Sequence, residues 1–228
     1  MRALGFLSVL ILTLTLLYLI FSGNLISKYF LTLGCIITFV LWILKGLFDL
    51  GIESVRGQFY VIVGTGFLFQ GLAFLFANVG KTVTFEIMGL VFMTLARLFF
   101  FASNARYILF FQTSGYYLPF IRLMLLLILF SFIFSLTFLI PNLSDHFINV
   151  SPLVAFIILD WGMVFVVLYN LLLLWGTEIG KRWAIGAFVI FSFLFADALF
   201  IAQFPNIFPL TLWTFAMFFM SLISLIKG

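Results

Sequence analysis

Long apolar runs recur along the whole chain, and each is close to the length that a helix needs to cross a bilayer. At a rise of 1.5 Å per residue, about 20 residues span the ~30 Å of hydrocarbon. The chain is 66% hydrophobic and only 8% charged, so a soluble core of 228 residues could not hide its apolar surface from water. Lipid is therefore the expected solvent, and the sequence predicts an all-α, polytopic transmembrane helical bundle.

Polar breaks divide the chain into eight predicted spans. The runs lack the period-2 alternation of barrel strands and are longer than such strands, so helices are expected. The connections are short, and we therefore expect a single integral membrane domain over residues 1–228. The predicted spans are residues 4–21, 29–50, 59–77, 83–101, 119–140, 153–175, 183–204 and 210–226.

Two of these boundaries need interpretation. The first span follows only Arg2 and has no small-residue cleavage site after it, so a retained helix is expected rather than a secretory signal. The segment at residues 102–117 is polar at its start, and the apolar Tyr107–Phe111 within it could form a short helix lying in the membrane interface. The fourth span is therefore predicted to end near Phe101.

The distribution of basic residues predicts the orientation. With eight spans, both termini and the loops after spans two, four and six share one side, and this side has more Lys and Arg than the other. The positive-inside rule then places both termini in the cytoplasm, whether the membrane is a bacterial inner membrane or a eukaryotic endomembrane. No clustered basic face is present, which argues against a nucleic-acid partner. The basic residues are Arg2, Arg56, Arg106, Lys181, Arg182 and Lys227 on the predicted cytoplasmic side, against Lys28 and Lys81.

The residue inventory excludes several kinds of site. A single cysteine, Cys35, permits no internal disulfide and no thiolate metal cluster. A single histidine, His146, excludes sites that need several imidazoles, such as His-ligated zinc. No phosphate-binding glycine loop and no Gly-x-Ser-x-Gly elbow is present. We therefore expect no metal and no cofactor.

Charges inside the spans are costly, at about 2.5–3.5 kcal/mol each on insertion scales, so each needs a partner or a purpose. Lys45 and Asp49 are four residues apart near the cytoplasmic end of the second span and can neutralise each other on one helix face. Arg97 is placed one to two turns from the cytoplasmic end of the predicted fourth span. There it could extend to the interface, or it could bind an anionic headgroup or Asp49.

Two aspartates have no such local explanation. Asp160 and Asp197 fall at similar depth in the sixth and seventh spans, and neither has a Lys or Arg at helical spacing within its own span. We expect both to face the bundle interior, with their carboxylates within reach of one shared water. A protonated acid beside an ionised base suits acid–base catalysis, proton relay or cation binding. Gln70, in the third span, is more typical of hydrogen bonding between helices.

The seventh span resembles a known membrane family. Its segment Phe193-Leu194-Phe195-Ala196-Asp197-Ala198 is similar to the small-residue–Asp signature of the lysoplasmalogenase-like (YhhN) family, whose members also have eight spans. Gly186-Ala187 resembles the Gly-Ala that opens that helix. Phe48-Asp49, followed by Gly64-x-Gly66-Phe67 and Gln70, is similar to the family's Gly-Asp helix and the helix after it. The sequence has Ala196, Phe48 and Gln70 where the family commonly has Ser, Gly and His.

The resemblance implies hydrolysis of the vinyl-ether bond of a lysophospholipid, without a cofactor. Asp197 with either Asp49 or Asp160 would supply the acid and the base, and Arg97, Lys45 and Gln70 are candidate substrate-binding residues. The competing class is a small transporter, channel or sensor whose buried carboxylates hold a proton or cation. A likeness between the third and seventh spans hints at the internal duplication of such transporters. A subunit of a larger membrane complex, or a homo-oligomer, is a third possibility.

Overall fold

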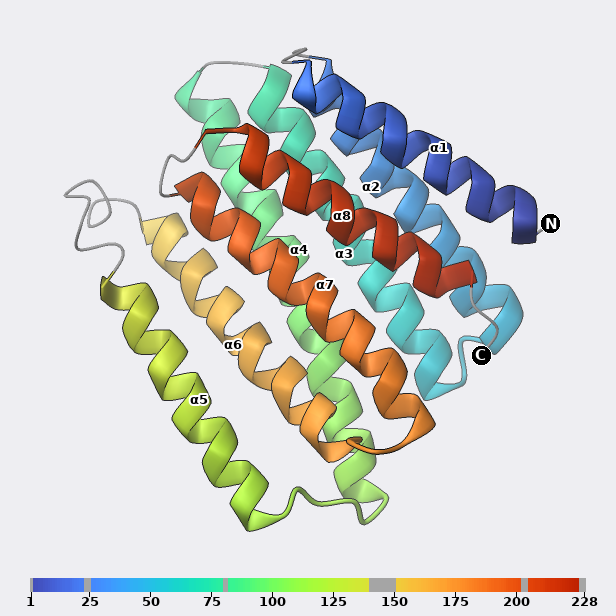
Figure 1. Cartoon of the computed structure of the whole chain (residues 1–228), viewed down its shortest axis with the longest axis vertical. Helices are drawn as coiled ribbons and strands as arrows, with labels where there is room; N and C mark the ends of the chain where they lie inside the picture. The colour runs from blue at the N-terminus through green and yellow to red at the C-terminus, as the bar shows by residue number, and fades with distance from the viewer. Residues whose placement is uncertain (1, 23–25, 80–81, 140–150, 202–204, 226–228) are drawn as a thin grey trace.

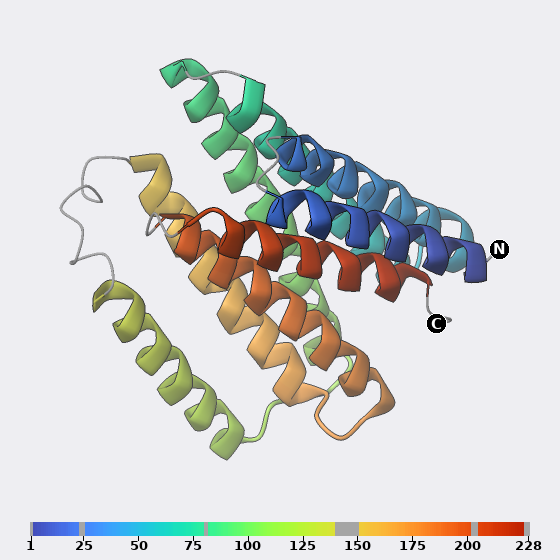
Figure 2. The same cartoon turned by 45° about the horizontal axis from the view of Figure 1, so that its top comes forward.

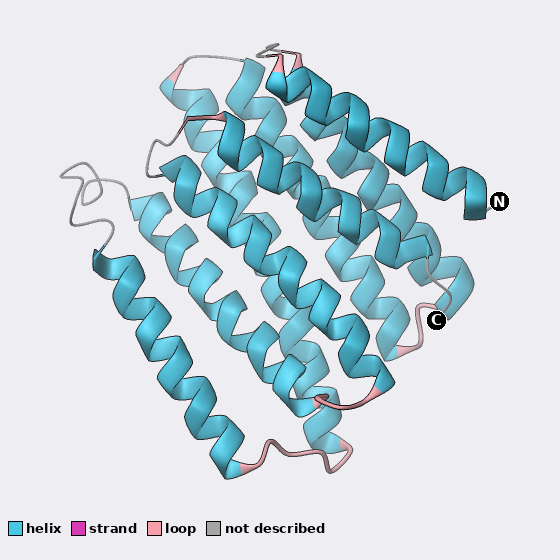
Figure 3. Ribbon diagram, viewed as in Figure 1, coloured by secondary structure: helices cyan, strands magenta, loops and turns pink. Residues whose placement is uncertain are grey.

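The computed structural model describes residues 2–22, 26–79, 82–139, 151–201 and 205–225. His146 and the predicted span ends at residues 140, 202–204 and 226 lie outside this part. The described residues form eight α-helices and no strand (Figure 3), as the long apolar runs predict. The helices are α1 (Arg2–Phe21), α2 (Ser27–Leu44), α3 (Val55–Val79), α4 (Val83–Thr113), α5 (Phe120–Leu139), α6 (Ser151–Leu173), α7 (Glu178–Ile201) and α8 (Ile207–Leu225), with a π-helical turn, η1 (Lys45–Leu50), extending α2.

The helices run side by side in two layers (Figure 1). Helices α2, α3 and α4 form one layer, in which α3 packs extensively against both neighbours. Helices α1, α8, α7 and α6 form the other, and α6 packs on α4 to join the layers, while α5 packs on α6 at the edge (Figures 1 and 2). Successive helices alternate in direction, so α1 begins at the end of the bundle where α8 ends. Three turns at this end contain a glycine with positive φ, namely Gly51, Gly115 and Gly176.

Many large apolar side chains are exposed on the surface of the bundle, whereas Gln70, Arg97 and Asp197 are buried inside it. On α5, for example, Phe120 and Ile121 are each 73% exposed. Four helices among the described residues are long and apolar enough to cross a membrane, namely Tyr29–Leu50, Val55–Val79, Val83–Thr113 and Ile207–Leu225, and shorter apolar helices accompany them. This arrangement is that of a membrane-embedded protein. The full set of eight spans and the cytoplasmic placement of the termini remain predictions.

Helix α4 is longer than the sequence pattern indicates. It continues without a break to Thr113, so the prediction that the fourth span ends near Phe101 is wrong. Residues 107–111 belong to α4 and do not form a separate short helix, and Tyr107 and Phe111 are buried. The polar residues after Phe101 do not end the helix because Ser103 Oγ and Asn104 Nδ2 donate hydrogen bonds to the carbonyl of Phe100 in the preceding turn. Their polarity is thus satisfied within α4 itself. As a consequence, Arg97 lies near the midpoint of a 31-residue helix.

Candidate functional site

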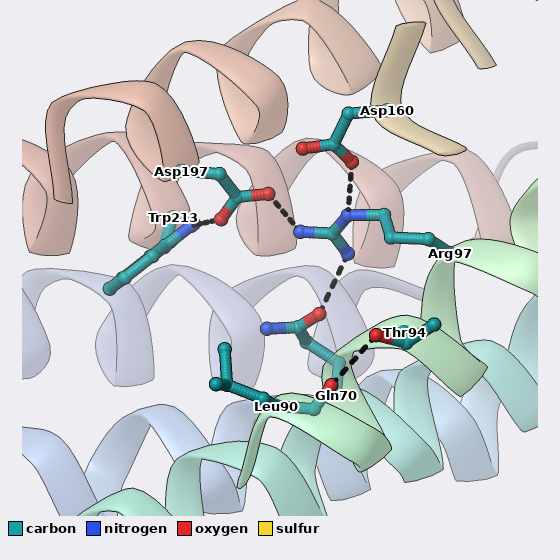
Figure 4. A network of polar contacts seen from close by, with 7 residues as sticks. All are labelled: Gln70, Leu90, Thr94, Arg97, Asp160, Asp197 and Trp213. Atoms are coloured by element: carbon teal, nitrogen blue, oxygen red, sulfur yellow. Dashed lines mark hydrogen bonds and ion pairs between the residues drawn. The ribbon is translucent and has the colours of Figure 1, made fainter. Parts of the chain in front are cut away.

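A fully buried arginine links four helices in the middle of the bundle. Arg97 of α4 has no exposed surface, and its Nε donates to Asp160 Oδ1 of α6 at 2.8 Å. Its Nη1 donates to Gln70 Oε1 of α3 at 2.7 Å, and its Nη2 is ion-paired with Asp197 Oδ2 of α7. Trp213 of α8 adds a fifth helix, because its Nε1 donates to Asp197 Oδ1 at 2.8 Å. We call these five residues the Arg97 cluster (Figure 4).

The sequence folds in this way because hydrocarbon offers a charge no other partner. Each polar side chain of the cluster lies in a long apolar helix, and burial against the others is less costly than exposure to lipid. Arginine suits the position, since its planar guanidinium presents several donors in fixed directions to different helices. Two rings add to its surroundings: the guanidinium carbon lies 5.8 Å from the ring centroid of Phe100 and 5.5 Å from that of Phe193.

The charges of the Arg97 cluster do not balance. One guanidinium and two carboxylates give a formal charge of −1 when all three are ionised, and Asp197 is 1% exposed while the Asp160 side chain is 13% exposed. A net charge in such surroundings is costly. The cluster therefore becomes neutral when it takes up one proton or one monovalent cation. The described residues include no group of three or more His, Cys, Asp or Glu side chains that could hold a metal ion.

An aromatic cavity approaches the Arg97 cluster from one end of the bundle. It has a volume of about 130 Å³ and lies between α2, α3, α4, α6, α7 and α8. The exposed Arg56 at the start of α3 marks its opening, and Phe67, Phe100 and Phe193 form its inner wall. These three rings pack together, with centroids 5.1 to 6.4 Å apart. Since Phe100 and Phe193 also contact the guanidinium, one layer of rings separates this cavity from Arg97.

A second cavity approaches the cluster from the opposite end. It has a volume of about 350 Å³ and is lined by the ends of α3 and the starts of α4 and α8. Polar side chains of Asn78, Glu86 and Asn206 line it on the outside, and Trp213 lines it on the inside. We call it the Trp213 cavity. Because the Trp213 indole donates a hydrogen bond to Asp197 Oδ1, this one ring lies between the cavity and the Asp197 carboxylate.

The interior placement predicted for Asp160 and Asp197 is confirmed, but the manner of their contact is different. Arg97 lies between the two carboxylates, in the position where a shared water was expected. The prediction that Arg97 lies one to two turns from the end of its helix is wrong, because α4 extends 12 residues beyond Phe101. Of the contacts considered for Arg97, neither extension to the interface nor a pair with Asp49 is present, because Arg97 is fully buried and bonded to Asp160, Gln70 and Asp197. Gln70 makes the expected hydrogen bond between helices.

Lys45 and Asp49 stand apart from the cluster. Their predicted pairing along one helix face is confirmed, with Lys45 Nζ 3.1 Å from Asp49 Oδ2. The Asp49 side chain is 57% exposed, so the structure does not bring this carboxylate to Asp197. Lys45 is 8% exposed and lines the aromatic cavity. The catalytic and substrate-binding roles considered for these residues remain predictions.

Sequence reasoning missed the contribution of Trp213 and of the phenylalanine layer. An indole N–H in an apolar span needs a hydrogen-bond partner, and this need is the signal that could have drawn attention to Trp213. The three phenylalanines carry no such signal among the 35 of the chain. No family model matches this sequence, and neither a curated protein nor a solved structure shows a significant match.

Proposed function

We propose that this protein is a small proton-coupled membrane transporter, with the Arg97 cluster as its proton site. One observation carries the proposal: a buried cluster with a formal charge of −1 lies between two cavities that approach it from opposite ends of the bundle. Intramembrane carboxylates of this kind are typical of proton and ion pathways. A site near the middle of the bundle, with a cavity toward each end and aromatic rings between each cavity and the site, suits alternating access.

Protonation would act through the ion pairs. A proton on Asp160 or Asp197 removes one of the two negative charges that hold the guanidinium, so Arg97 binds more strongly to the remaining carboxylate. The two carboxylates lie on different helices, α6 and α7, and each state of protonation therefore favours a different packing of these helices against α4. Phe100 and Phe193 contact the guanidinium and line the aromatic cavity, which couples the proton to the access of that cavity.

The proposal is tested by proton flux in liposomes. The purified chain is reconstituted with a pH-sensitive dye inside, and a pH gradient is imposed with potassium and valinomycin to clamp the voltage. We expect protein-dependent flux in the wild type and its loss in Asp160→Asn and in Asp197→Asn. Glu53→Gln is the matched control, because Glu53 is an exposed carboxylate that lines neither cavity. Equal flux in the wild type and both aspartate variants would refute the proposal.

A lipid hydrolase of the lysoplasmalogenase type is the second candidate. Two interior carboxylates and an aromatic cavity with Lys45 and Arg56 among its lining residues favour it. However, neither Asp160 nor Asp197 lines either cavity, so a lipid in the aromatic cavity would be separated from both by the phenylalanine rings. The assay is release of aldehyde from a lysoplasmalogen by the wild type and by Asp197→Asn. Aldehyde formed by the wild type alone would favour the hydrolase over the transporter.

A further inference from the structure

The aromatic cavity is built for a small ligand. Its volume of about 130 Å³ is close to that of a cavity of about 150 Å³ that holds benzene. An acyl chain of a membrane lipid is much larger than one benzene ring, so the cavity fits a single ring better than a lipid tail. Eight of its 18 lining residues are aromatic. The Trp42 and Tyr60 rings stack with centroids 4.5 Å apart, and Trp183 packs edge-on against Tyr107 at 5.3 Å.

The polar groups of the cavity define the rest of the ligand. Lys45 and Arg56 line its outer part, and the lining residues include no carboxylate; Lys45 is ion-paired with Asp49. A carboxylate fits this pair, because charge-assisted hydrogen bonds to Lys and Arg are strong. Deeper in the cavity, Asn104 is 1% exposed, and its Oδ1 is buried without a hydrogen-bond partner in the described structure. An acceptor left in this state favours a ligand O–H or N–H.

We propose that the aromatic cavity binds a small aromatic carboxylate that carries a ring hydroxyl or N–H. The carboxylate lies at Lys45 and Arg56, the ring lies among the aromatic side chains, and the donor reaches Asn104. This inference names the substrate of the proposed transporter, and it rests on that proposal for the role of the site but not for binding itself. The cavity meets the usual form of a small-molecule site, with mostly apolar walls and a few polar groups that fix orientation.

Substitution of Gly186 by a larger residue should fill the cavity. Gly186 lines the cavity, and a Cβ built on it meets no atom within 4 Å. A larger side chain at this position therefore enters the cavity without displacing the backbone. Gly186→Leu should fill the space, whereas Gly186→Ala adds one methyl group and serves as the matched control for the change in helix propensity.

The experiment measures binding of radiolabelled 4-hydroxybenzoate to the purified full chain by scintillation proximity. We expect saturable binding by the wild type and by Gly186→Ala, and its loss in Gly186→Leu. Lys45→Met and Asn104→Ala should each weaken binding about tenfold, the effect of one lost strong hydrogen bond. Thr32→Val is the control for Asn104, because Thr32 also has a buried, unpartnered side-chain oxygen but does not line the cavity.

Unlabelled competitors test each part of the ligand. Benzoate lacks the hydroxyl and should compete about tenfold more weakly than 4-hydroxybenzoate, with no further loss in Asn104→Ala. p-Cresol lacks the carboxylate and should also compete weakly. Equal competition by p-cresol, unchanged binding in Gly186→Leu, or no saturable binding by folded wild type would overturn the inference, as would displacement only by a lysophospholipid. If binding is absent but aspartate-dependent proton flux is present, the proposed ligand site is refuted and the transporter proposal is not. If binding is present but no flux is seen, the transporter proposal is refuted and the ligand site is not.

Discussion

Replacement of Arg97 by methionine should strongly destabilise the bundle. The change keeps much of the side-chain volume but leaves Asp160 and Asp197 without their cation. Breaking a buried ion pair from one side costs about 3–5 kcal/mol. The Asp197 side chain is 1% exposed and the Asp160 side chain 13%, so most of this cost arises at Asp197. At about 2–4 °C per kcal/mol for a chain of this length, the melting temperature should fall by roughly 6–20 °C.

The matched comparison removes all three charges at once. Arg97→Met combined with Asp160→Asn and Asp197→Asn leaves no uncompensated charge, so this triple variant should recover most of the lost stability. The stability of Arg97→Lys should lie between that of the wild type and that of Arg97→Met, because one ammonium cannot reach the three partners that the guanidinium binds. The assay is thermal unfolding in detergent, followed by size-exclusion chromatography of the protein that remains folded. A fall of less than about 2 °C in the single variant, or a triple variant no better than it, would refute the account of the cluster.

Three further outcomes are expected from the structure. Trp213→Phe removes the donor to Asp197 Oδ1 and should lower the free energy of unfolding by about 1–3 kcal/mol, measured by the same thermal assay. Gly66→Ala should cost about 1–3 kcal/mol by overpacking, because its Cβ would lie 2.5 Å from the Phe100 ring, and Phe100→Leu should relieve part of this loss. A reporter fused at the C-terminus should give a cytoplasmic signal, and one inserted at residues 144–151 should not; the reverse pattern would contradict the predicted orientation.

The helices themselves could be predicted from the sequence, because apolar length alone decides whether a segment is helical in lipid. The Lys45–Asp49 pair could also be predicted from the sequence, since an i,i+4 contact depends on one helix only. The end of α4 could not be predicted from the sequence. Ser103 and Asn104 donate hydrogen bonds to the Phe100 carbonyl, and the helix therefore continues past them rather than ending there. Polarity in sequence does not distinguish these two outcomes.

The Arg97 cluster needed knowledge of which helices are neighbours. The sequence places Asp160 and Asp197 inside the bundle, but Arg97 is 63 residues from the first and 100 from the second. Nothing in the local pattern of α4 indicates that this helix packs against α6. The two cavities depend still more on packing, since they are spaces left between side chains of many helices. Function was therefore the part of the account that the sequence could least determine.

The most direct test of the central claim is the charge displaced when the pH is stepped on a solid-supported membrane carrying the protein. If the Arg97 cluster takes up a proton from one of the two cavities, the wild type should give a transient current upon the pH step. The current should be absent in the Asp160→Asn, Asp197→Asn double variant and retained in Glu53→Gln. A current of equal size in the folded double variant, or none in the folded wild type, would contradict the account.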